Sequence, residues 1–117
     1  MISYPIQGQP QTFRQADVAS ASDTTLFTCG ANFDALLECV KVCNKTAGAV
    51  TVDAWWGNGS ATDYILKGKS IAANDTLFLD ALSMRYAPGE TLKIRASAGT
   101  SLDVSATFVL IHKNTPR

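Results

Sequence analysis

A short internal repeat constrains the fold of this chain more than any other feature of its sequence. The segment IAANDTLFLD at residues 71–80 is echoed by YAPGETLKIR at residues 86–95. Each copy places a two-residue turn, Ala73-Asn74 or Pro88-Gly89, before an acidic residue and a Thr-Leu pair that starts an alternating run. Turn residues followed by period-two alternation are typical of antiparallel strands. The repeat therefore predicts two turn-strand units of a small β-sandwich, and it carries no chemistry of its own.

Strand-like segments continue along the chain at the spacing of β-hairpins. A chain of 117 residues is expected to form one domain around a single core. About eight strands without a helical period predict an all-β fold, a single antiparallel β-sandwich or jelly-roll-like domain. We expect strands near residues 13–19, 25–29, 35–44, 49–56, 62–67, 76–80, 91–98 and 102–112, with weaker strands at 69–72 and 82–86.

Alternation within three of these segments assigns side chains to the two faces of the sheets. In the 91–98 segment, Lys93, Arg95 and Ser97 are expected to face solvent. The apolar side chains on the opposite faces form the predicted core: Val50, Val52, Ala54 and Trp56, then Leu92, Ile94, Ala96 and Ala98, then Leu102, Val104, Ala106, Phe108 and Leu110.

The first 23 residues differ in composition from the rest of the chain. They contain Pro5, Pro10, four Gln and an Ala/Ser run, with only isolated apolar anchors. Such a segment contributes little core of its own, so residues 1–23 are predicted to form an extended N-terminal arm before a β-sandwich domain at residues 24–117. We expect the arm to contact either a neighbouring chain or the surface of its own domain.

The charge balance argues against two classes of partner. Ten basic residues offset ten acidic ones, and no run of Lys or Arg occurs. Binding to a phosphate backbone requires a basic footprint, so neither nucleic acid nor a membrane surface is an expected partner. No apolar stretch is long enough to span a bilayer, and residues 1–5 lack the features of a secretion signal. Synthesis in a cytoplasm is therefore the expectation.

Residues with catalytic or ligand-binding chemistry do not form a recognisable motif. His112 is the single histidine, and the three cysteines contain no CxxC pair, so no metal site is predicted. Cys39 and Cys43 are about 13 Å apart along one predicted strand, too far for a disulfide, and free thiols are expected. The acidic residues show no paired spacing, and no Gly-rich phosphate loop precedes a helix. We predict no catalytic residues and no cofactor, and a hydrolase is the least favoured function.

Several apolar side chains fall on faces of strands where a solvated sandwich would carry polar residues. Together with the apolar anchors of the arm they are the predicted interface residues: Tyr4, Ile6, Phe13, Trp55, Ile65, Phe78, Val109 and Ile111. Large exposed apolar patches usually mark a binding surface. The alternative is that the arm or long loops cover these residues within one subunit.

A family resemblance follows from several quoted segments. The run ECVKVCNKT at residues 38–46, the return strand VTVDAW at 50–55, the two Ala-x-x-(Asp/Glu)-Thr-Leu echoes and the closing LDVSA at 102–106 resemble small β-sandwich virion proteins of tailed bacteriophages. The resemblance covers roughly residues 25–110. It implies a structural protein without catalytic residues, located in the virion after synthesis in the host cytoplasm.

Three functional expectations follow from the resemblance and from the surplus apolar residues. The first is a capsid decoration or cement protein that contacts capsid or tail proteins and forms a homo-oligomer, with a trimer favoured. Its close alternative is a head-to-tail connector or tail subunit. A third is a glycan-binding module of a tail fibre, in which Trp55 or Tyr64 would stack on a sugar beside Asp53 and Asp63.

Overall fold

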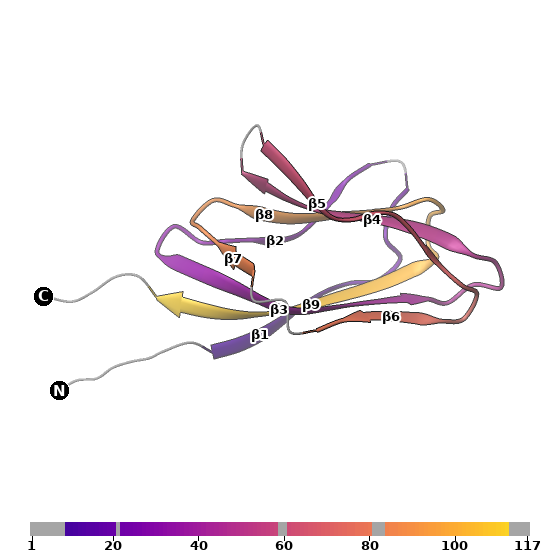
Figure 1. Ribbon diagram of the computed structural model, residues 1–117, viewed down its shortest axis with the longest axis horizontal. Coiled ribbons are helices and arrows are strands. Elements are labelled where there is room, and N and C mark those ends of the chain that lie inside the picture. Colours follow the sequence, from indigo (N-terminus) through magenta and orange to yellow (C-terminus); the bar gives the residue numbers. More distant parts are fainter. Residues whose placement is uncertain (1–8, 21, 59–60, 81–83, 113–117) are drawn as a thin grey trace, which may run out of the picture.

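The part of the chain that the structure describes forms nine β-strands arranged in two layers (Figure 1). The computed structural model describes residues 9–20, 22–58, 61–80 and 84–112, and these residues contain no helix. The elements in chain order are β1 (Gln9–Gln15), β2 (Thr24–Thr28), β3 (Phe33–Asn44), β4 (Val50–Asn58), β5 (Ala61–Ile71), β6 (Thr76–Leu79), β7 (Met84–Tyr86), β8 (Thr91–Ala96) and β9 (Leu102–His112).

The strand pairing is that of a jelly roll. Sheet A has the order β1-β9-β3-β6, with β7 also paired to β3, and sheet B has the order β2-β8-β4-β5. These pairs are antiparallel. In a jelly roll, one long antiparallel hairpin folds over on itself, and its successive strand pairs here are β4·β5, β3·β6, β2·β8 and β1·β9. A jelly roll of this kind packs two four-stranded sheets face to face. The predicted all-β sandwich is confirmed.

The N-terminal segment departs most from its predicted structure. Residues 9–15, within the predicted arm, form edge strand β1 of sheet A and pair with β9 from Gln9↔Leu110 to Gln15↔Val104. The predicted strand at 13–19 is therefore displaced toward the C-terminus relative to the observed strand at Gln9–Gln15. The sequence of β1 shows no apolar alternation, although its Phe13 packs against the core. The strand ends before Asp17, whose φ of 55° is left-handed. Residues 1–8 of the predicted arm lie outside the described residues.

The remaining strands differ from expectation in smaller ways. The two segments predicted at 62–67 and 69–72 are one strand, β5, which has register irregularities opposite Val52–Trp55 and a left-handed Gly68. A bulge of this kind lets a long strand bend without ending. Ala98, predicted in the core, is exposed, because β8 ends at Ala96 and the chain then turns toward β9. Trp56 and Leu110 are half-buried at the margin, and the other predicted core residues are buried.

An aromatic cluster joins the two sheets at the centre of the core. Phe27 of β2 stacks on Phe108 of β9 with ring centroids 3.8 Å apart, and Phe13 contacts both rings edge-on at 4.9 and 5.9 Å. Tyr86 adds an edge contact to Phe108 at 5.3 Å. Burial of each such ring stabilises the fold by about 1.5–3 kcal/mol. Phe13 thereby anchors β1, which explains why a strand of otherwise polar residues pairs at this edge.

Asn44 fixes the end of β3 to two turns. Its side chain is fully buried, and its amide nitrogen Nδ2 donates hydrogen bonds to the carbonyl oxygens of Gly48, Ile71 and Ala72 at 2.8, 3.0 and 3.2 Å. Its Oδ1 accepts from the backbone N–H of Thr46 at 3.0 Å. A buried amide with this many partners is satisfied rather than costly. The Asn-Lys-Thr hairpin of the sequence is therefore tied to the turn that begins the first copy of the repeat.

Candidate interaction surfaces

The outer face of sheet A carries an apolar end. Cross-strand partners share a face, so the register aligns Pro10 of β1, Val109 of β9 and Leu36 of β3 in one row across the sheet. Ile111 of β9 lies one row further toward the strand end, opposite Asp34. We call Leu36, Val109 and Ile111 the apolar end of sheet A. Val109 and Leu36 are half-buried, and Ile111 is 39% exposed.

An ion pair borders this apolar end. Asp34 is buried although it lies on an outer face, and its carboxylate accepts a hydrogen bond from the guanidinium of Arg85, which lies opposite Leu36. The Arg85 side chain itself is largely exposed. The guanidinium of Arg85, on the neighbouring strand β7, compensates the negative charge of the buried carboxylate. The apolar end of sheet A is therefore bordered on the β7 side by a paired acid and base.

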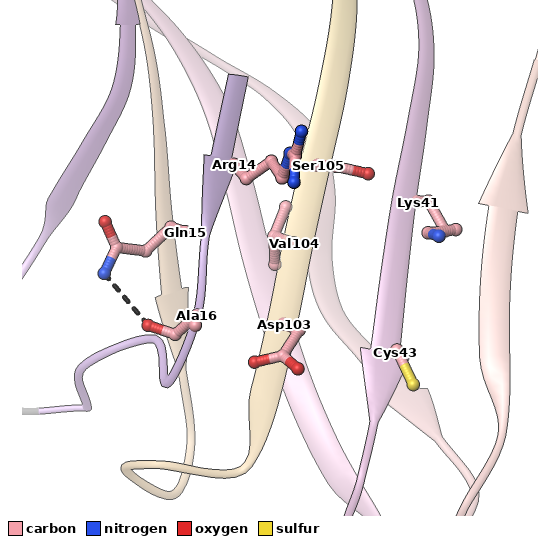
Figure 2. Close-up of a pocket in the computed structure, with 8 residues that line it drawn as sticks. All are labelled: Arg14, Gln15, Ala16, Lys41, Cys43, Asp103, Val104 and Ser105. Atoms are coloured by element: carbon pink, nitrogen blue, oxygen red, sulfur yellow. Dashed lines mark hydrogen bonds between the residues drawn. The ribbon is translucent and has the colours of Figure 1, made fainter. Parts of the chain in front are cut away.

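The middle of the same face is basic and grooved. A groove of about 340 Å³ runs along β9 near the end of β1 (Figure 2). Arg14 of β1 and Lys41 of β3 lie on either side of Ser105, and Phe78 of β6, 55% exposed, completes the row beyond Lys41. The residues that line the groove are Arg14, Gln15, Ala16, Lys41, Cys43, Asp103, Val104 and Ser105.

A three-residue ion cluster lies at the lower end of the groove. The ammonium of Lys45 contacts the carboxylates of Asp17 and Asp103, and its distance to Asp103 is 2.9 Å. Hydrogen bonds to Asp17 and then to Asp103 raise the pKa of Lys45. The hydrogen bond from Lys45, followed by one from the backbone N–H of Asp17, lowers the pKa of Asp103. The cluster is exposed to solvent, so it orients the chain after β1 more than it stabilises the fold.

The outer face of sheet B carries an aromatic pair. Trp55 of β4 lies opposite Tyr64 of β5, and their ring centroids are 5.8 Å apart. Tyr64 is 50% exposed, and the ammonium of Lys67 lies 4.6 Å from its ring centroid, a cation–π contact. Lys93 of β8 is the partner of Trp55 on the other side. This face therefore combines two aromatic rings with two lysines.

The acidic residues expected around this pair are not assembled there. Asp63 is the register partner of Trp56, so it lies on the opposite face of sheet B from Tyr64. The Oδ1 atom of Asp53 accepts a hydrogen bond from the backbone N–H of Gly68 at 2.6 Å, which engages it in the bulge of β5. Of the two acids predicted to surround a bound sugar, Asp53 is engaged by the backbone and Asp63 is on the other face. Lys67 and Lys93 lie beside the aromatic pair instead.

The predicted interface residues divide into three groups. Tyr4 and Ile6 lie outside the described residues. Phe13 and Ile65 pack against the core of their own domain, as the covered-core alternative expects. The outward side chains are Trp55, Phe78, Val109 and Ile111, with Phe78 the most exposed of these.

Two residues of these surfaces, Leu36 and Tyr64, are not among the predicted interface residues. Leu36 and Leu37 are adjacent, so alternation alone does not say which one faces outward. A register shift between Leu37 and Cys39 settles the faces, and this bulge leaves Leu36 outward and Leu37 buried. The outward position of Leu36 could have been inferred only by pairing it with Val109. The sequence predicts sugar binding as the role of Tyr64, whereas its partner Trp55 is also a predicted interface residue.

The chemistry-bearing residues remain dispersed. No group of three or more potential metal ligands occurs among the described residues. The buried Cys29 thiol donates to the carbonyl oxygen of Phe33 at 3.2 Å, and His112 contacts the Phe33 ring at 4.9 Å between centroids. No disulfide joins Cys29, Cys39 or Cys43 among the described residues, as the sequence predicts. Within the described ranges, no helix is long and apolar enough to cross a membrane.

Comparison with known proteins establishes the fold class. No protein-family model matches the chain, and no curated protein sequence matches it. The VP2 subviral particle of infectious bursal disease virus matches with a TM-score of 0.50 and 15% identity, over 90% of this chain and 33% of the viral one. The T13 particle of the same virus gives a TM-score of 0.50 and 10% identity over 90% and 31%.

A third match has nearly the same length as this chain. A subunit of Bacillus endospore appendages, described as disulfide-linked pili, matches with a TM-score of 0.50 and 12% identity over 96% of each chain. The chain spans about a third of the viral chains it matches. At these identities the likeness concerns the fold alone. The chain is therefore a β-sandwich domain with jelly-roll strand order, similar in fold to subunits of viral particles and of a bacterial pilus.

Proposed function

We propose that this chain is a non-enzymatic structural subunit of a virion, and specifically a decoration or cement protein on the head of a tailed bacteriophage. The observation that carries the proposal is the outer face of sheet A, where Phe78 and Ile111 are exposed and Val109 is half-buried on a rigid sheet. Apolar side chains held outward by a sheet suit repeated contacts between subunits. The similarity in fold to subunits of viral particles and the phage resemblance of the sequence support this role.

The subunit would act in many copies. We infer a homo-oligomer, most simply a trimer, whose contacts with capsid or tail proteins are individually modest and gain strength through multivalency. In this proposal residues 1–8, with Tyr4 and Ile6, reach a neighbouring subunit. The chain carries equal numbers of basic and acidic residues, which favours contacts with protein over contacts with packaged nucleic acid.

The test is incorporation of the protein into phage particles and its copy number there. The full chain should be present in hundreds of copies for capsid decoration, whereas a single ring of copies would mean a connector or tail subunit. Absence from particles would overturn the proposal. Deleting residues 1–8 should reduce incorporation and particle stability, whereas a deletion that extends through β1 would remove a strand and test only folding.

A matched pair of substitutions tests the outer face. Phe78→Glu should reduce incorporation, because it places a charge on the most exposed aromatic side chain of sheet A. Thr76→Glu, on the same strand and the same face, is the control. Both variants should keep the thermal stability of the parent chain, and equal incorporation of the two would contradict a role for Phe78.

The aromatic pair of sheet B favours a second candidate, the glycan-binding module of a tail fibre. Trp55 and Tyr64 lie side by side on one face, and Lys67 and Lys93 would suit a saccharide that carries carboxylates. Binding to a glycan array that is lost in Trp55→Ala and kept in Phe78→Ala would establish this candidate. Loss of binding in neither variant would remove it.

A further inference from the structure

We propose that the apolar end of sheet A, formed by Leu36, Val109 and Ile111, is the docking surface for residues 1–8 of a neighbouring copy of this chain. The inference deepens the proposed structural role and rests on it, because it names the acceptor surface for the N-terminal segment. The copies would exchange these segments reciprocally, so each would contribute one segment and one acceptor surface.

The acceptor surface is defined by the register of three strands. Val109 on β9 lies between Pro10 of β1 and Leu36 of β3, and Ile111 follows on the same face. The Asp34–Arg85 ion pair closes one side of this surface. The basic residues of the face, Arg14 and Lys41, belong to the row of Ser105, two alternating positions away from Val109 along β9. The apolar end is therefore two alternating positions away from the basic row, and the Asp34–Arg85 ion pair lies beside it, opposite Ile111 and Leu36.

The composition of residues 1–8 matches this surface. The segment MISYPIQG contains four apolar residues with large side chains, Met1, Ile2, Tyr4 and Ile6, and no charged side chain. A segment without charged side chains gains nothing from the basic groove around Arg14 and Lys41. It gains free energy by removing the apolar side chains of both partners from water, at roughly 25 cal/mol per Å² of apolar surface buried.

The direction of β1 points the segment toward another copy. Gln9, the first described residue, pairs with Leu110, and β9 ends at His112, so β1 begins near the end of sheet A that carries Ile111. In the proposal, residues 1–8 continue along the line of β1 and leave the sheet. Eight extended residues span about 27 Å, enough to cross a neighbouring subunit that approaches at this end. The apolar end of each copy would then lie where the segment of the other arrives.

Disulfide trapping tests the contact directly. In full chains with Cys39→Ser and Cys43→Ser, one copy carries Ile6→Cys and a differently tagged copy carries Val109→Cys. Mild oxidation of the mixture should give a crosslinked dimer that contains both tags. Pairing Ile6→Cys with Ser105→Cys, on the same strand and face, is the control and should give at least roughly tenfold less crosslink. Equal trapping at both positions, no trapping, or trapping only within a single chain that carries both cysteines would each overturn the proposal.

Self-association of the full chain supplies an independent measurement. Val109→Glu should weaken association by roughly tenfold or more, whereas Ser105→Glu should leave it unchanged, as measured by light scattering against concentration. Val109→Ser, which adds no charge, should weaken association with little change in thermal stability, which separates docking from folding. Association that survives both Val109→Glu and Val109→Ser, or that Ser105→Glu weakens as much as Val109→Glu does, would overturn the inference.

The outcome is separable from that of the proposed function. A chain that enters particles yet gives no crosslink at Val109 would overturn the docking surface and leave the virion role in place. A chain that crosslinks at Val109 yet is absent from particles would support the docking surface and overturn the virion role.

Discussion

The two copies of the internal repeat have the same turn and different surroundings. In each, the backbone N–H of the acidic residue donates to the carbonyl oxygen three residues earlier, Asp75 to Ala72 at 3.2 Å and Glu90 to Ala87 at 3.1 Å. The third residue of each turn is left-handed, with φ of 56° at Asn74 and 86° at Gly89. Yet the first copy leads into β6 at an edge of sheet A, and the second leads into β8 inside sheet B.

This difference shows which properties are local and which come from the fold. Turn chemistry sets the backbone of both copies, because Asn and Gly both tolerate positive φ. Exposure depends on position. Strand β8 has partners on both sides and buries Leu92 and Ile94, whereas β3 is the one strand paired with β6 among the described residues, and Phe78 is left outward. An edge strand therefore turns the same sequence pattern into a candidate contact surface.

The largest effect expected from this comparison is at the paired leucines of the two Thr-Leu motifs. Leu92→Ala should lower the free energy of unfolding by about 2–5 kcal/mol, because Leu92 is fully buried and its removal leaves a cavity. Leu77→Ala, at the equivalent position of the half-buried edge strand, should cost only about 1 kcal/mol. Urea denaturation of the two variants measures both values. Equal losses would mean that β6 is covered as thoroughly as β8.

The anchors of the two turns should differ by a smaller amount. Asn44→Ala should destabilise the protein by roughly 3 kcal/mol, since it removes a buried donor to three carbonyl oxygens at and near the first turn. Glu90→Gln at the second turn should cost less than about 1 kcal/mol. The amide oxygen can still accept from the Trp56 indole and from Ala87, which now donate to Oε1 at 3.0 and 2.6 Å.

Thermal and urea unfolding measure this pair, with Asn44→Asp as a further variant. A carboxylate cannot donate to the carbonyl oxygens, so Asn44→Asp should be at least as destabilising as Asn44→Ala. A stable Asn44→Asp protein would show that the buried amide is not the anchor of the first turn.

Much of the fold was accessible from the sequence because it depends on alternation and turn residues. The predicted core residues of β4 and β9, the two turns of the repeat and the outward Phe78 follow from local patterns, and the structure confirms them. The residues of β1 differ from the prediction because its sequence is polar apart from Pro10 and Phe13, and the pairing with a strand far along the chain, β9, defines it. Polar edge strands carry no local signal of their pairing.

The candidate surfaces were less accessible for the same reason. Val109 and Ile111 were recognised as outward, but their grouping with Leu36 depends on the β3–β9 register and on the bulge after Leu37. The placement of Asp63 away from Tyr64, by contrast, follows from alternation between neighbouring residues of one strand and was open to prediction. Register shifts arise from tertiary packing, so a sequence pattern gives the faces of single strands and not the neighbours across them.

Substitutions at the residues that precede the two turns should change the free energy of unfolding in opposite directions. Ile71 and Tyr86 begin the two copies and both are buried, but the Tyr86 hydroxyl has no hydrogen-bond partner among the described residues. Burial raises the pKa of Tyr86, so it stays neutral, and the cost lies in the desolvated hydroxyl. Tyr86→Phe should therefore stabilise the protein by about 1 kcal/mol. Ile71→Val, which only removes a methylene group, should destabilise it, and loss of stability in Tyr86→Phe would indicate a partner for the hydroxyl.

The smallest effect expected is the pH dependence contributed by the ion cluster beside the first turn. Lys45 precedes Thr46, whose carbonyl oxygen accepts from the N–H of Asn74, so the cluster supports the first copy and not the second. The pKa of Asp103 is lowered from its ordinary 3.8, so its contribution is present above that value and is lost as pH falls through the lowered pKa. The pKa of Lys45 is raised from 10.5, so its contribution is lost only as pH rises through the raised value.

Unfolding free energies measured from pH 2 to 6 should fall more steeply toward acid in the parent chain than in Asp103→Asn, and added salt should shrink the difference. Parallel profiles would mean that the exposed cluster orients the chain without stabilising it.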